Sequence, residues 1–107
     1  MTSDKRLIPG LDDEVNMGHL KNVRRLLQQG ADVNGRNALG DTPLIAAAFT
    51  GQAAMVRLLL EFGADTAATD LIFGKTASQQ AHELKHEAVI QAFAEWPARV
   101  PWVETRG

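Results

Sequence analysis

Short motifs in this chain recur at a constant spacing of 33 residues. Gly30-Ala31-Asp32 returns as Gly63-Ala64-Asp65, and Leu26-Leu27 returns as Leu59-Leu60. A fixed period of this length is typical of stacked helical repeats, in which each unit buries its apolar face only against its neighbours. Because such stacks build extended surfaces, the recurrence predicts an interaction module rather than an enzyme.

The clearest repeat lies in the middle of the chain, between Gly40 and Asp65. Thr42 can cap the start of a first helix, and Pro43 suits the first helical position. Gly51 can adopt the left-handed conformation that ends this short helix before the next one begins. The repeat therefore predicts two short helices joined by a tight turn.

These motifs closely resemble the ankyrin-repeat family. The Thr-Pro-Leu start at Thr42, the alanine pair, the mid-repeat Gly51 and the Gly63-Ala64-Asp65 end fit the family pattern, and residues 18–34 fit it too. The last repeat departs from the pattern, since Lys85 stands where the family has glycine. Departures are expected in terminal repeats, because their outer faces meet water.

The resemblance implies an all-α fold, an ankyrin-repeat solenoid of three helix-turn-helix repeats with projecting loops or short β-turns. We expect a single domain over residues 1–107, with repeats at about 7–36, 37–69 and 70–95 and a C-terminal tail at 96–107. The expected helices cover residues 11–17, 21–29, 43–50, 53–62, 77–84 and 87–95. The expected core includes Leu26, Leu27, Leu44, Val56, Leu59, Leu60 and Phe93.

Composition argues against several functional classes. The net charge is −2 and no basic stripe exists, so we expect no nucleic-acid binding. No apolar run is long enough to span a membrane, and residues 1–11 lack the apolar segment of a secretory signal. Without cysteine the chain has no disulfides and no thiol chemistry. We therefore expect a cytoplasmic monomer without a cofactor.

His82, Glu83 and His86 form the pattern H-E-x-x-H. On one continuous helix, two histidines at this spacing can hold zinc while the glutamate acts as general base, so a zinc hydrolase is an alternative function. The repeat register argues against it, because it places a helix end between the two histidines. It also gives His86 the position of His19 and Gln52 in their own repeats, and it places His82 near the packed seam between repeats. We predict no catalytic residue and no metal ligand.

The resemblance implies a concave binding surface formed by the loop tips and the first helix of each pair. The positions expected to contact a partner protein are Met17, Arg36, Leu39, Asp41, Phe49, Thr50, Leu71, Ile72, Phe73, Lys75 and Leu84, with Asn16, Ala38 and Glu83 on the same face. Several are large and apolar, and contiguous exposed apolar surface usually marks an interaction site. The alternative is that Leu71-Ile72-Phe73 folds inward, into space made by the one extra residue of its loop.

The expected function is non-catalytic protein binding, as an adaptor, an inhibitor or an immunity-like partner of another protein. Besides the zinc hydrolase, a structural segment of a longer repeat array stays open as an alternative. The atypical ends at Pro9-Gly10 and Trp96-Pro97 look like caps and speak against the array. We expect Trp96 and Trp102 to cover the open end of the stack rather than to anchor a partner.

Overall fold

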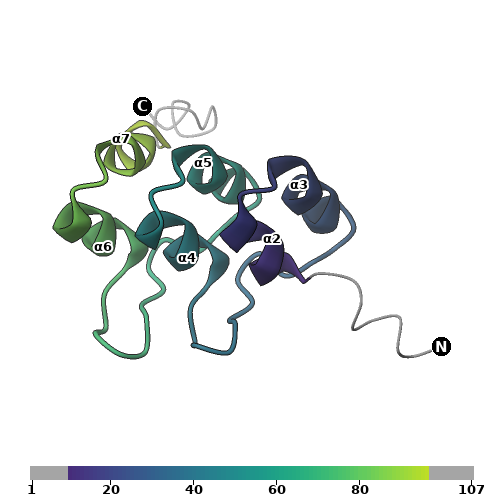
Figure 1. The fold of residues 1–107 in the computed structure, drawn as a ribbon, viewed down its shortest axis with the longest axis horizontal. Helices are drawn as coiled ribbons and strands as arrows, with labels where there is room; N and C mark the ends of the chain where they lie inside the picture. The colour runs from purple at the N-terminus through teal and green to yellow at the C-terminus, as the bar shows by residue number, and fades with distance from the viewer. Residues whose placement is uncertain (1–9, 97–107) are drawn as a thin grey trace, which may run out of the picture.

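The computed structural model describes residues 10–96, and this part of the chain forms six α-helices in three helix-turn-helix pairs (Figure 1). The pairs are α2 (Leu11–Met17) with α3 (Leu20–Gln28), α4 (Pro43–Phe49) with α5 (Ala53–Glu61), and α6 (Ala77–Leu84) with α7 (Glu87–Glu95). The predicted all-α architecture is confirmed, and no predicted helix end is wrong by more than one residue.

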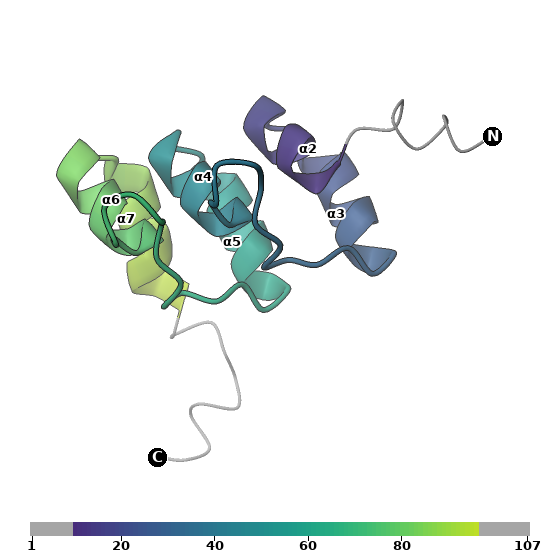
Figure 2. The same ribbon diagram turned by 90° about the horizontal axis from the view of Figure 1, so that it is seen from below.

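The helices form two layers. The first helices α2, α4 and α6 lie side by side, and the second helices α3, α5 and α7 form the other layer (Figure 1). Helix α4 packs against both α2 and α6, and α5 packs against both α3 and α7. The first loop (residues 31–42) and the second loop (residues 64–75) project from the first layer, away from the second (Figures 1 and 2).

The 33-residue period recurs in the core. Val23, Val56 and Val89 occupy equivalent places in α3, α5 and α7, and all three are fully buried. In the first layer, the small side chains of Ala47 and Ala81 are buried at equivalent places in α4 and α6. Each pair of helices therefore uses the same faces to pack against its neighbours.

The predicted core is confirmed at Leu27, Leu44, Val56, Leu59 and Leu60, which are all buried. It is wrong at Leu26 and Phe93, which are only partly buried. These two residues stand in the register positions of Leu59 and Leu60. Among the second helices of residues 10–96, α3 and α7 each have one neighbour while α5 has two. One side of each terminal helix therefore lacks a packing partner within this range.

Threonine side chains begin two of the first helices. The hydroxyl of Thr42 accepts a hydrogen bond from the amide of Ile45 at 3.2 Å, at the start of α4. Thr76 forms a capping box at the start of α6, since its hydroxyl accepts from the Gln79 amide while the Gln79 side chain accepts from the Thr76 amide. These caps satisfy amides that the helices leave unpaired and fix where each loop ends.

Trp96 follows α7 and packs, partly buried, against the core. The expectations for Pro9, for Trp102 and for the rest of the tail lie outside the described residues. No helix of residues 10–96 is both long and apolar enough to cross a membrane.

Candidate functional site

A groove of about 450 Å³ opens between the two loops and the ends of helices α4 and α6. Five large apolar side chains and five polar ones line it, and they are Leu39, Phe49, Ile72, Phe73 and Leu84, with Asp41, Asp70, Lys75, Gln80 and Glu83. We call this site the loop groove. The structure thus brings together seven of the eleven predicted contact residues, namely Leu39, Asp41, Phe49, Ile72, Phe73, Lys75 and Leu84.

The apolar residues of the loop groove are open to solvent. Leu39 is 71% exposed, Phe49 58%, Ile72 75% and Phe73 72%. The neighbouring Leu71 is 70% exposed, so the tripeptide Leu71-Ile72-Phe73 points outward and does not fill space beneath its loop. Folded monomers rarely leave so many neighbouring large apolar side chains in water unless the surface serves binding.

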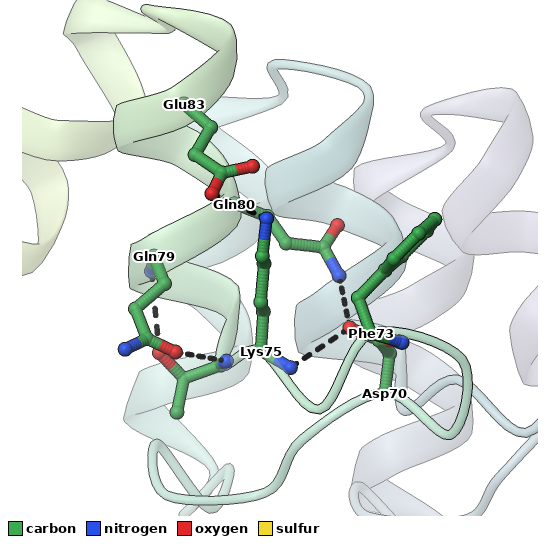
Figure 3. A network of polar contacts seen from close by, with 7 residues as sticks. Asp70, Phe73, Lys75, Gln79, Gln80 and Glu83 are labelled. Carbon is green, nitrogen blue, oxygen red and sulfur yellow. Dashed lines mark hydrogen bonds and ion pairs between the residues drawn. The ribbon is translucent and has the colours of Figure 1, made fainter.

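The second loop is organised by the carboxylate of Asp70, which is itself buried (Figure 3). It accepts hydrogen bonds from the backbone amides of Ile72 at 2.8 Å, Phe73 at 2.5 Å and Lys75 at 3.0 Å, and from Gln80 Nε2 at 2.8 Å. The bond from the Phe73 amide is the main cause that lowers the pKa of Asp70 to about 2, against the opposing effect of burial. The four donors hold the loop in one shape and present Ile72 and Phe73 at its tip.

Further contacts tie the second loop to its surroundings. The ammonium of Lys75 pairs with the carboxylate of Glu83 on α6 and lies 5.7 Å from the centre of the Phe73 ring. The amide of Asp65 donates to Asn34 Oδ1 at 2.8 Å, which joins the second loop to the first. The groove walls are therefore fixed before any partner arrives, which lowers the entropy cost of binding.

Asp41 differs from the other charged residues of the loop groove. Its carboxylate is partly buried and makes no hydrogen bond with any residue of the described chain. Burial is the first cause that raises the pKa of Asp41, and the negative charge of Asp70 adds to it, while the positive charge of Arg36 opposes it. The groove therefore holds one anionic group that the chain itself stabilises poorly.

Four predicted contact residues lie outside the loop groove: Met17, Arg36, Thr50 and Leu71. The guanidinium of Arg36 donates to the carbonyls of Gly40 and Thr69, at 3.0 Å for the latter, so it links the two loops. The hydroxyl of Thr50 donates to the carbonyl of Ala46 at 2.8 Å. These two side chains have partners within the chain, whereas Met17 remains exposed at the end of α2.

Leu71 lies against the first loop. A β-carbon added to Gly40 would come within 2.4 Å of Leu71 Cδ1, and Gly40 has a φ of +85°. A larger residue at position 40 would therefore have to displace the Leu71 side chain and adopt a strained backbone conformation.

Sequence reasoning missed Asp70 and Gln80 as groove residues. The available signal was an aspartate placed next to the extra residue of the second loop, since aspartate side chains commonly bond backbone amides in turns. Nothing in the sequence pattern indicated that Gln80, ten positions further on, would reach the same carboxylate.

The H-E-x-x-H pattern is divided between two helices. Helix α6 ends at Leu84, Lys85 is left-handed with φ 60° and ψ 39°, and His86 stands at the N-cap of α7. The predicted helix end between the two histidines is confirmed. His86 Nε2 donates to the carbonyl of Phe49 at 3.0 Å, and His82 Nδ1 donates to the carbonyl of Ser78 at 3.0 Å.

The expected place of His82 at a packed seam is wrong, because His82 is exposed. Its counterpart Ala48 is buried in α4, which has a first helix on each side. Helix α6 has such a neighbour on one side only within residues 10–96. No group of three or more His, Cys, Asp or Glu residues able to hold a metal ion occurs in that range.

Comparison with known proteins links the chain to repeat proteins. Residues 14–60 match the family model described as ankyrin repeats (many copies). The chain is 38% identical over 74 residues to the probable E3 ubiquitin-protein ligase XBOS33 of Oryza sativa subsp. japonica, which covers 69% of this chain and 14% of the relative. It is 36% identical over 81 residues to the ankyrin repeat and SAM domain-containing protein 6 of Rattus norvegicus, covering 75% of this chain and 9% of the relative.

A third relative is the mitochondrial disaggregase of Bos taurus, which is 42% identical over 55 residues, or 51% of this chain and 8% of the relative. The chain thus spans between 8% and 14% of the length of these three proteins.

Proposed function

We propose that this chain, which belongs to the ankyrin-repeat family, binds another protein through the loop groove and performs no chemistry of its own. Ankyrin-repeat domains are generally non-catalytic protein-interaction modules. The observation that carries the proposal is the group of exposed apolar side chains around one groove, to which Phe49 and Phe73 come from different repeats. Aromatic anchors in pockets dominate the energetics of many protein interfaces.

The relatives support a recognition role. Their names describe a probable ubiquitin ligase, a SAM-domain protein and a disaggregase, so the shared stretch is not tied to one reaction. For a chain of this kind we propose the role of an adaptor, an inhibitor or an immunity-like partner, since each of these needs only non-covalent binding. We also propose that it acts as a monomer in the cytoplasm, which sedimentation and fractionation of cells would test.

The zinc-hydrolase alternative has a weaker physical basis. Two histidines that share one helical face can bind a metal together, but His82 and His86 lie on either side of a left-handed residue. In addition, the ring nitrogen Nε2 of His86 is engaged by the carbonyl of Phe49. Binding of zinc by these two side chains would require this junction to rearrange.

The proposal is tested by capture of a partner with matched variants. The wild-type chain, the variant Phe49→Ala/Phe73→Ala and the control Leu20→Ala are each used as bait in native lysate. Leu20 is 41% exposed but lies on α3, in the other layer of helices. We expect a protein that is retained by the wild type and by the control and is lost with the double variant. Retention of every captured protein by the double variant would contradict the proposal.

A further inference from the structure

The charged side chains of the loop groove differ in how many ion pairs and hydrogen bonds they form within the chain. Four ionisable residues line it: Asp41, Asp70, Lys75 and Glu83. Lys75 and Glu83 pair with each other, and Asp70 accepts four hydrogen bonds from its own loop and from Gln80. Asp41 and Asp70 therefore give the groove an excess of negative charge, and only the carboxylate of Asp41 lacks a hydrogen bond from the described chain.

Arg36 is the cation that acts on Asp41, but it does not form a hydrogen bond with it. Its guanidinium donates to the carbonyls of Gly40 and Thr69, which hold it between the two loops. Burial of the Asp41 carboxylate and the nearby charge of Asp70 both disfavour its ionised form. A cation supplied from outside would relieve both effects.

This arrangement discriminates between partners. A neutral segment that covered the groove would bury further a carboxylate that has no hydrogen-bond donor, which is costly. An acidic segment would in addition be repelled by Asp41. A segment with an ammonium or guanidinium group would pair with the carboxylate, and charge complementarity of this kind gives specificity and speeds association.

The apolar residues of the groove set a second requirement for the side chains that a partner presents. Leu39 and Phe49 lie close in space to Ile72, Phe73 and Leu84, and together they form a surface for large aliphatic or aromatic side chains. A volume of about 450 Å³ suits a few side chains of a partner.

Building on the proposed function, we propose that the loop groove takes a segment of the partner protein in which a large apolar side chain stands close to a lysine or arginine that pairs with Asp41. The apolar side chain packs between Phe49 and Phe73, and the cation meets the carboxylate beside Leu39. The partner is thus recognised by adjacent apolar and basic side chains.

A random twelve-residue peptide library displayed on phage tests this directly. The library is selected on the immobilised full chain and screened for clones that lose binding to Phe49→Ala/Phe73→Ala. We expect such groove-dependent clones to be enriched in sequences with a large apolar residue near Lys or Arg, relative to the unselected library.

A selected peptide labelled with fluorescein then supports a double-mutant cycle. We expect Asp41→Asn to weaken binding by about five- to tenfold, and replacement of the peptide's basic residue by norleucine to weaken it equally. Both changes together should weaken it no further, because they remove the same pair. Asp13→Asn, an exposed aspartate of α2 outside the groove, is the matched control and should leave affinity unchanged.

The outcomes separate the two proposals. Groove-dependent peptides without a basic residue, or with affinity unaffected by Asp41→Asn, would overturn this inference and leave the proposed function standing. A library without any clone that depends on Phe49 and Phe73 would contradict both. A dimer of the chain that Phe49→Ala/Phe73→Ala dissociates in sedimentation would mean that a second copy occupies the groove, and the inference would be wrong.

Discussion

The imidazole of His86 lies against Gly51, so that a β-carbon added to Gly51 would come within 3.1 Å of His86 Nδ1. Gly51 has a φ of +74°, where residues with a side chain are strained. The same relationship recurs one repeat earlier, where a β-carbon on Gly18 would stand 3.3 Å from Gln52 Oε1. Each of these two tight turns is thus covered by the side chain that begins the second helix of the next repeat.

Gly51→Ala should therefore lower the free energy of unfolding for two reasons, backbone strain of roughly 1–2 kcal/mol and the contact with His86. Gly30→Ala is the matched control, because Gly30 has a φ of +102° and nothing within 4 Å of the added β-carbon. Denaturant unfolding should show a larger loss for Gly51→Ala than for Gly30→Ala. Equal losses would mean that His86 does not restrict this turn.

Lys85 lies in the tight turn between α6 and α7, at the place that Gly18 and Gly51 occupy in the other two repeats. We expect Lys85→Gly to stabilise the protein. Lys85 is the one residue other than glycine with positive φ among residues 10–96, and no further repeat in that range places a side chain over it. Removing the strain of a left-handed lysine should gain about 1 kcal/mol in the free energy of unfolding. Lys85→Ala keeps the strain and should show no such gain. A loss of stability in Lys85→Gly would contradict this account of the junction.

Leu59→Ala should cost roughly 2–5 kcal/mol, because Leu59 is fully buried in the central helix α5. Leu26→Ala removes the same atoms at the equivalent position of α3, where the side chain is only partly buried. Its cost in urea unfolding should be clearly smaller. If Leu26→Ala proved as costly as Leu59→Ala, the claim that the core of the terminal repeat is less buried than that of the central repeat would be wrong.

Asp70→Asn should destabilise the second loop in a pH-dependent way. The pKa of Asp70 is lowered from 3.8 to about 2 in the folded chain, so its carboxylate contributes stability in full above pH 3.8. This contribution is lost as the pH falls from there towards 2. The difference in unfolding free energy between the wild type and Asp70→Asn should be constant above that range and shrink within it. Glu14 also has a lowered pKa, but it is present in both proteins and its contribution cancels. Because the charge of Asp70 also raises the pKa of Asp41, both proteins are compared in an Asp41→Asn background, so that the subtraction isolates Asp70. A difference that stayed constant down to pH 2 would contradict the role of the carboxylate.

Local sequence signals predicted the helices well. Thr42, Pro43 and Gly51 each act through neighbouring backbone atoms, so the residues themselves determine where helices start and end. The buried valines at positions 23, 56 and 89 follow from the same period. Seven of the eleven predicted contact residues also proved to line one groove, because the register placed loop tips and helix ends on one face.

The wrong and missing predictions concern burial and contacts that depend on how separate parts of the chain pack together. The period treats Leu26 like Leu59 and His82 like Ala48, but burial depends on whether another helix lies alongside, which the repeat pattern does not encode. The period also gives no sign that the Arg36 side chain donates to the carbonyl of Thr69 in the second loop. The Asp70 carboxylate collects four donors whose convergence is a property of the folded loop, and only the structure reveals it.

The central claim is that Phe49 and Phe73 serve binding and not folding. The most direct test measures the affinity of the captured partner for Phe49→Ala and Phe73→Ala by calorimetry, alongside the melting temperature of each variant. We predict that each change weakens binding by roughly 2 kcal/mol, or about 30-fold, while the melting temperature hardly moves. Unchanged affinity together with a melting temperature lowered by several degrees would show that these side chains support the fold, and it would contradict the proposed site.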